Sequence, residues 1–250
     1  MSPDDDAVRV RTVISGAPRG AVEVPAAVEA LAAGRSLRPV WRNELGGLTF
    51  EVGGGAGFVK FAPAGSRLPL RREAERLRWA GRHTPVPEVL AEGADETGDW
   101  LHTAALPGRC AVDERWLADP RRAVAAIGHG LRELHERLPV DRCPFTWSVA
   151  ERIAGRPVHA DAPPVDRLVV CHGDACAPNT IVGDDGEWTG HVDLAALGVG
   201  DRWADLAVAS YSLGWNYGPG WEPVFFAAYG IEPDPGRIAF YRWLWDLGSP

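Results

Sequence analysis

The sequence predicts an α+β protein with two lobes, a small β-rich N-terminal lobe and a larger, mainly helical C-terminal lobe. The chain has 250 residues, of which 46% are hydrophobic and 24% charged, so it is long enough to bury two cores. Short extended runs separated by glycines fill residues 40–103, whereas helical spacing dominates further on. We therefore place the N-terminal lobe at residues 1–102, a hinge at 103–108 and the C-terminal lobe at 109–250.

The N-terminal lobe is predicted to contain short strands and two helices. Its expected elements, in chain order, are a polar leader (1–20), a short helix (25–33), a hairpin (48–52 and 58–61), a helix (70–80) and two strands (89–90 and 100–103). Gly34 and Gly81 end the two helices, and the glycine-rich stretch 53–57 makes the hairpin turn. Lys60 falls on the second strand of that hairpin.

The C-terminal lobe is predicted to be mostly helical. Apolar residues recur at spacings of three and four from Val124 to Leu138, which indicates an amphipathic helix. The other expected elements are a buried strand (168–171), a hairpin (180–182 and 188–192), a helix (201–210) and a C-terminal helix (237–247). The buried strand leads into His172-Gly173-Asp174.

The charge of the chain argues against nucleic acid or an anionic membrane as a partner. The formal net charge is -8, and nearly all of it belongs to the second half, since residues 109–250 alone carry a net -7. This distribution favours a cationic ligand. No apolar run is long enough for a membrane helix and the first residues are acidic, so we expect a cytoplasmic protein.

Four cysteines, at positions 110, 143, 171 and 176, are too few for a disulfide framework. Cys171 and Cys176 are separated by four residues without a second ligand pair, which is a poor zinc signature. We expect reduced thiols, with these two packing as small apolar side chains beside the loop. Lys60 is the only lysine among 26 basic residues, so either it does something that arginine cannot, or it survives by chance.

The strongest candidate site combines Asp174, Asn179 and Asp193. An aspartate and an asparagine five residues apart on a loop, with a second aspartate after the next hairpin, form the layout of a kinase catalytic centre. Phosphoryl transfer needs one carboxylate near the acceptor hydroxyl, and Mg²⁺ needs hard oxygen ligands such as an amide and a second carboxylate. Each residue alone is more simply a turn or strand-end residue, but the ordered set favours the site.

The N-terminal lobe supplies candidates for nucleotide binding. Lys60 on a strand and Glu73 on the following helix match the pair that holds the α- and β-phosphates of ATP in kinases. Glu75 is the alternative acidic partner, on another face of the same helix. By itself Glu73 reads as an exposed helix charge, and the lone lysine is what favours the functional interpretation.

The loop and the residues after it resemble a known family, the aminoglycoside O-phosphotransferases of the 3′ or 3″ type, which act on drugs such as kanamycin or streptomycin. The matching stretches are Val170 to Asn179, Val192-Asp193-Leu194, Leu197-Gly198, Asp201 to Ala207, Arg237 to Arg242 and Leu134-His135 with Cys143-Pro144-Phe145. The resemblance runs from about residue 39 to residue 247. It implies a protein-kinase-like fold that uses ATP and Mg²⁺.

The resemblance also implies roles for individual residues. Asp174 becomes the catalytic carboxylate that meets the acceptor, Asn179 and Asp193 the magnesium ligands, and Asp205 a brace beneath the catalytic loop. The backbone of Ala104 and of Leu106 is expected to meet the adenine. Asp246 falls where the family binds the ammonium groups of the drug. The implied partner is a cationic aminoglycoside, and the protein is expected to be a monomer or weak dimer.

One departure from the family pattern follows Asp193. The family commonly continues with Asp-x-Gly-Arg, whereas this chain has Leu194-Ala195-Ala196, from which we expect lower activity. Two other functions stay open: a kinase of a different hydroxylated molecule, such as a macrolide or a choline-like or sugar-amine metabolite, and a nucleotide-binding protein with little catalysis.

Overall fold

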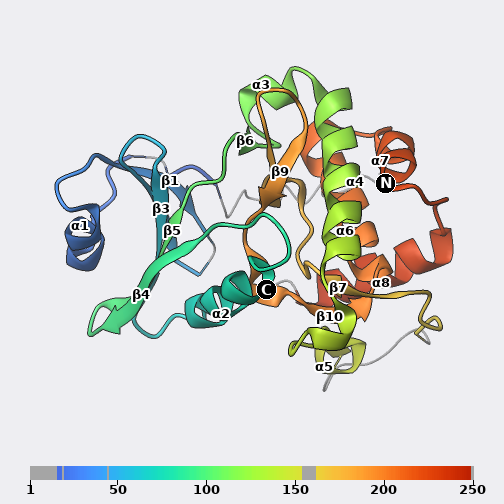
Figure 1. The fold of residues 1–250 in the computed structure, drawn as a ribbon, viewed down its shortest axis with the longest axis horizontal. Helices are drawn as coiled ribbons and strands as arrows, with labels where there is room; N and C mark the ends of the chain where they lie inside the picture. Colours follow the sequence, from blue (N-terminus) through green and yellow to red (C-terminus); the bar gives the residue numbers. More distant parts are fainter. Residues whose placement is uncertain (1–15, 19, 44, 154–161, 249–250) are drawn as a thin grey trace, which may run out of the picture. The chain divides into compact units, whose positions relative to one another are not determined.

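The computed structural model describes residues 16–18, 20–43, 45–153 and 162–248, and these form two compact units (Figure 1). The first unit comprises the chain up to Leu70 together with Leu90–Ala104, and the second comprises Arg71–Val89 and the chain from Ala105 onward. Most of the predicted leader lies outside the described residues. The functional boundaries at residues 102 and 109 stay a prediction.

The first unit is built on a five-stranded sheet with the order β1-β2-β3-β5-β4. The strands are β1 (Leu37–Arg42), β2 (Leu48–Val52), β3 (Gly57–Pro63), β4 (Val89–Asp95) and β5 (Gly98–Ala104). Neighbours from β1 to β5 pair antiparallel. Helix α1 (Ala26–Ala32) packs on this sheet. Its Val28 joins alternate residues of β2 and β3 in the core, and Val28, Phe50 and Val59 have no exposed surface.

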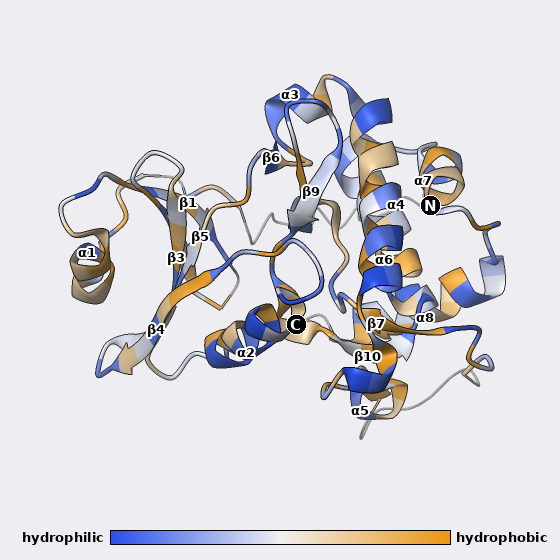
Figure 2. Ribbon diagram, viewed as in Figure 1, coloured by the Kyte–Doolittle hydropathy of each residue, from blue (hydrophilic) through white to orange (hydrophobic). Residues whose placement is uncertain are grey.

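Helices make up most of the second unit. They are α2 (Leu70–Ala80), α3 (Glu114–Leu117), α4 (Pro120–Arg137), α5 (Val149–Ile153), α6 (Trp203–Tyr217), α7 (Glu222–Tyr229) and α8 (Pro235–Gly248). Helix α4 packs against α7, and α6 packs against α8. Figure 2 shows hydrophilic and hydrophobic bands alternating along α4, as its spacing of apolar residues predicts. Asp119 caps α4 by accepting the Arg122 N–H, and Pro120 starts the helix.

Two small sheets in the second unit position the polar loops. Strands β6 (Arg109–Cys110), β8 (Thr180–Val182) and β9 (Trp188–His191) form one, and β7 (Leu168–Cys171) pairs with β10 (Gly198–Asp201) in the other. The register places Cys171 opposite Gly198 and Thr180 opposite His191. The loop after β7 and the turn before β10 therefore meet at one end of these sheets.

The predicted α+β class is confirmed, and so are most of the predicted elements. The helix expected from Asp201 begins instead at Trp203, because Asp201 ends β10 and its Oδ1 accepts the Trp203 N–H at 3.1 Å. It then continues to Tyr217. Helix α7 and the short strand β6 were not predicted. No described helix combines the length and the apolar character needed to cross a membrane.

Candidate active site

The loop that follows β7 holds Asp174 and Asn179 together. A 3-10 turn, η2 (Ala177–Asn179), brings the asparagine back toward the aspartate. The Asn179 Nδ2 donates to the Asp174 carbonyl at 2.8 Å and to its Oδ2 at 3.3 Å. Asn179 is buried, whereas Asp174 is only partly buried. The Asn179 amide nitrogen is thus used to hold Asp174, and its carbonyl oxygen is the atom suited to a cation.

A buried carboxylate supports this loop from helix α6. Asp205 has no exposed surface, and it accepts the N–H groups of His172 at 2.6 Å and of Gly173 at 2.9 Å. It also meets the His135 Nε2 of α4 at 2.9 Å. Burial alone would raise the pKa of Asp205, but the hydrogen bond and charge of His135 and the Gly173 N–H bring this pKa below its usual value. The loop backbone is therefore tied to a charged group that cannot easily move.

His172 connects the same loop to the strand that precedes Asp193. Its Nδ1 lies 3.3 Å from the Asp174 N–H, and its Nε2 lies 2.9 Å from the Val192 carbonyl oxygen. Since the backbone N–H can only donate, Nδ1 is the acceptor in the first contact, and Nε2 donates to the carbonyl in the second. This histidine is a buried structural link between the Asp174 loop and the end of β9.

Asp193 lies two residues after the end of β9, next to the Asp174 loop. The Val192 N–H donates to the Asn179 carbonyl at 3.0 Å, which brings this chain end beside η2. Asp193 is exposed and adopts the left-handed conformation, with φ 63° and ψ 49°. Such a backbone is unfavourable for a residue with a side chain and concentrates at functional sites. The strained conformation turns the chain into a second 3-10 turn, η3 (Leu194–Ala196).

Gly173 fits the two loops against each other. It has φ +84°, and a Cβ at this position would stand 2.2 Å from the Ala196 carbonyl oxygen. Backbone atoms cannot yield to such an overlap, so only glycine is accommodated here. Ala196, which replaces the arginine of the family's Gly-Arg, is thus part of the surface on which the Asp174 loop rests.

The side-chain oxygens of Asn179 and Asp193 suit magnesium. Mg²⁺ prefers oxygen ligands and is usually bound by one or two carboxylates together with substrate phosphates rather than by a complete protein cage. The described residues contain no group of three or more His, Cys, Asp and Glu side chains that could hold a metal ion. The pair fits a site that substrate phosphates complete.

The first unit contains two of the predicted nucleotide-binding residues. Lys60 is partly buried on β3, between Thr49 of β2 and Leu101 of β5 in the sheet register. Ala104 ends β5 and pairs with Gly57. Both positions are held by regular backbone pairing rather than by a loop.

The second unit contains the other predicted residues. On α2 the Glu73 side chain is buried, with 4% exposure, whereas Glu75 is exposed and lies 3.7 Å from Arg71 in an ion pair. The structure therefore separates the two acidic candidates by burial. Leu106 lies against Gly190, since a Cβ added to Gly190 would come within 2.6 Å of the Leu106 Cδ1. Asp246 is exposed near the end of α8.

Comparison with known proteins assigns the chain to a family. The family model described as "Phosphotransferase enzyme family" matches residues 28–157 and 151–241. An aminoglycoside 3′-phosphotransferase of Streptomyces fradiae is 38% identical over 220 residues, covering 73% of this chain and 81% of that protein. A streptomycin 3″-kinase of Streptomyces griseus is 31% identical, covering 82% and 89%. The chain belongs to the aminoglycoside phosphotransferase family.

Solved structures agree with this assignment. The aminoglycoside phosphotransferase APH(3″)-Id of Streptomyces rimosus matches with a TM-score of 0.71 and 28% identity, over 89% of this chain and 96% of that one. The same enzyme in complex with ADP and streptomycin matches with a TM-score of 0.65 and 29% identity, over 81% and 91%. The predicted kinase-like fold and the predicted enzyme class are confirmed.

Several contacts around the Asp174 loop were not predicted from the sequence. Cys176 was expected to be an apolar packing residue, but its Sγ lies 3.1 Å from the Asp174 Oδ1, so that interpretation was wrong. His135 binds Asp205 from a helix seventy residues away. Arg152 of α5 donates to the Gly173 carbonyl at 3.4 Å and stacks 4.5 Å from the Trp147 ring centre. The partners of His135 and Arg152 are distant in sequence. Cys176 lies only two residues from Asp174, but its residue type gives no sign of this contact.

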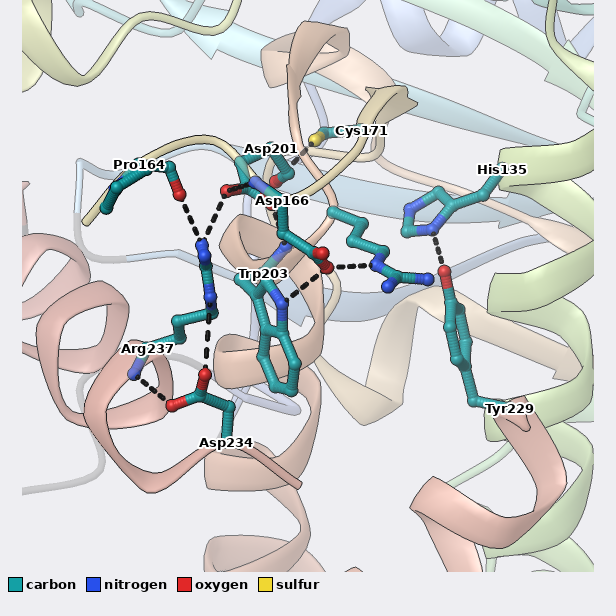
Figure 3. Close-up of polar contacts among 10 residues, drawn as sticks. His135, Pro164, Asp166, Cys171, Asp201, Trp203, Tyr229, Asp234 and Arg237 are labelled. Atoms are coloured by element: carbon teal, nitrogen blue, oxygen red, sulfur yellow. Dashed lines mark hydrogen bonds and ion pairs between the residues drawn. The ribbon is translucent and has the colours of Figure 1, made fainter. Parts of the chain in front are cut away.

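A polar network fixes the start of α6 (Figure 3). This is the helix that carries Asp205. Asp166 accepts hydrogen bonds from the Arg202 Nε at 2.6 Å and from the Trp203 indole at 2.9 Å. The bond from Arg202 holds the pKa of Asp166 below its usual value. Asp201 accepts the Asp166 N–H at 3.0 Å and pairs with Arg237 at 3.3 Å. Helix α6, which supports the Asp174 loop through Asp205, is therefore anchored at its first residues.

Proposed function

We propose that this protein transfers the γ-phosphoryl group of ATP to the 3′ or 3″ hydroxyl of an aminoglycoside and thereby confers resistance to the drug. The observation that carries this proposal is the arrangement of Asp174, Asn179 and Asp193 on two loops that Asp205 and Gly173 hold together. Family membership and the printed activities of the relatives support the choice of acceptor.

Asp174 is the general base in this proposal. Its carboxylate orients the acceptor hydroxyl and accepts its proton, while the acceptor oxygen bonds to the γ-phosphorus. The bond between that phosphorus and the β,γ-bridging oxygen breaks, and ADP leaves. Asp205 acts only by holding the loop, because both of its oxygens are bonded to the His172, Gly173 and His135 donors.

Asn179 and Asp193 are the residues that would hold Mg²⁺. When bound, the ion neutralises charge on the phosphates of ATP. Lys60 and Glu73 are our candidates for phosphate binding, and the backbone of Ala104 and of Leu106 for adenine binding. The lysine is a compact charge with three donors, which suits contact with phosphate oxygens.

The acceptor is expected to be polycationic. The net -7 of residues 109–250 attracts such a molecule, and exposed Asp246 is our candidate for binding its ammonium groups. A cytoplasmic location, where ATP is available, and a monomer or weak dimer go with this function.

The experiment measures ADP release by the purified protein with MgATP and a panel of acceptors. The panel is headed by streptomycin and kanamycin, and it includes a macrolide, choline and an uncharged polyol. We expect ADP release with at least one aminoglycoside and none with the polyol. Release only with the macrolide or choline would overturn the acceptor class, and ATP binding without release for any acceptor would indicate a protein that binds nucleotide without catalysis.

A further inference from the structure

The thiol of Cys176 points at the carboxylate assigned as the general base. Its Sγ lies 3.1 Å from the Asp174 Oδ1, within the distance of a hydrogen bond to sulfur. Burial, and then the charge of Asp174, raise the pKa of this thiol well above its usual value. The sulfur therefore keeps its proton at neutral pH and acts as a donor toward Oδ1.

The donors behind Cys176 fix the direction of this hydrogen bond. The Ser212 Oγ of α6 accepts the Ala177 N–H at 2.9 Å and the Asn216 Nδ2 at 3.1 Å. With both lone pairs used, the serine hydroxyl hydrogen is left to donate. Ser212 lowers the pKa of the Cys176 thiol, as a hydroxyl that donates toward the sulfur would.

Both oxygens of the Asp174 carboxylate then have a donor from the protein. Cys176 holds Oδ1, and the Asn179 amide holds Oδ2 at 3.3 Å. Two donors on opposite oxygens fix the rotation of the carboxylate about its Cβ–Cγ bond. The second lone pair of each oxygen is not needed by these contacts, so the held carboxylate can still accept a proton.

We propose that Cys176 is a positioning residue for phosphoryl transfer, whose thiol fixes the plane of the Asp174 carboxylate toward the acceptor hydroxyl. The inference rests on the proposed function, since it assigns Cys176 a part in that same reaction. A thiol is a weak donor, so it orients Oδ1 while withdrawing little of the basicity that the transfer step needs.

The test compares three substitutions of Cys176 in the full chain, with the acceptor that the panel identifies. Cys176→Ser keeps a donor at this position, whereas Cys176→Ala and Cys176→Val remove it, the latter at similar side-chain size. We expect kcat to fall about tenfold or more in the two variants without a donor, since misplacement of a catalytic group is costly. KM for ATP and for the acceptor should stay the same, and Cys176→Ser should keep kcat within about threefold of the wild type.

A matched control comes from a second thiol of the same unit. Cys143 contacts the Phe145 carbonyl at 3.5 Å, so Cys143→Ala should leave kcat unchanged. Melting temperatures identify any loss of folding. Cys176→Ser and Cys176→Ala both reduce side-chain volume and differ in one hydroxyl, so their comparison isolates the donor. Full kcat in Cys176→Val, or equal losses in the serine and valine variants, would overturn the inference. A wild-type protein that transfers phosphate to no acceptor would instead overturn the proposed function, and this inference with it.

Discussion

Replacing Asp205 with asparagine tests the support of the catalytic loop most sharply. The substitution keeps size and shape but puts an NH₂ group where one carboxylate oxygen was. Oδ2 serves both His172 and His135, whereas Oδ1 serves Gly173, so the amide will place its oxygen at the Oδ2 position. The Gly173 N–H then faces a second donor with no acceptor between them.

The expected cost follows from these three hydrogen bonds. An unpaired buried N–H costs about 1–3 kcal/mol, and each of the two remaining bonds loses about 1 kcal/mol when its acceptor becomes neutral. The sum is about 3–5 kcal/mol, which agrees with the usual cost of breaking a buried ion pair. For a chain of this length it corresponds to a fall in Tm of roughly 6–20 °C.

Calorimetry and urea unfolding at neutral pH measure this difference, with Asp141→Asn as the control. The Asp141 side chain is 80% exposed, and its loss should change stability by less than about 0.5 kcal/mol. The pKa of Asp205 is lowered in the folded protein, so its contribution is present above the usual aspartate pKa and is lost as the pH falls through the folded value. If the free energy of unfolding of Asp205→Asn lay within about 1 kcal/mol of the wild-type value at neutral pH, Asp205 would not support the loop as described.

Three further predictions follow from neighbouring residues. Gly173→Ala should abolish activity and destabilise the fold by several kcal/mol, because the new Cβ would overlap the Ala196 carbonyl. The control is Gly220→Ala, which has φ +96° and open space around it and should cost only about 1–2 kcal/mol in thermal unfolding. Equal losses of stability in the two variants would contradict the close approach at Gly173. Burial, and then the neighbouring His172 and His135, hold the pKa of His191 well below its usual value. The free energy of unfolding should therefore fall by about 1.4 kcal/mol per pH unit below about pH 6.5, where only the unfolded chain takes up the proton. His191→Leu should flatten this slope when unfolding by urea is measured at several pH values. An unchanged slope would argue against the burial of His191. Lys60→Arg should lose most of the ADP release while keeping its Tm, because a planar fork cannot replace the compact ammonium; a fully active variant would make the lone lysine incidental.

The sequence predicted the parts of the site that are local in the chain. Asp174 and Asn179 share one loop, and Asp193 follows the next hairpin, so their grouping depends only on a strand, a turn and a hairpin that the pattern of apolar residues indicates. Gly34 and Gly81 likewise marked helix ends that the structure confirms. Such features depend on one short stretch of the chain, since Asp174 and Asp193 are nineteen residues apart.

The contacts that hold the loop in place are not local. Asp205 meets His135 and His172 from separate elements, and Ser212 reaches the loop from α6. Cys176 looked apolar in sequence because a thiol gives no sign of its partner. The start of α6 was predicted at Asp201 rather than at Trp203 for a similar reason, since Asp201 pairs with Leu168 in a strand. Tertiary pairing decides these cases, and periodicity within one element does not report it.

Turnover of Asp174→Ala, with MgATP and the acceptor that the wild type phosphorylates, decides whether Asp174 is the general base. ATP affinity is measured in parallel by equilibrium binding, since the side chain acts in the transfer step and not in nucleotide binding. We expect ADP release to fall by several orders of magnitude while ATP affinity stays nearly the same. Turnover at the wild-type rate would contradict the assignment of Asp174 as the general base and with it the proposed mechanism.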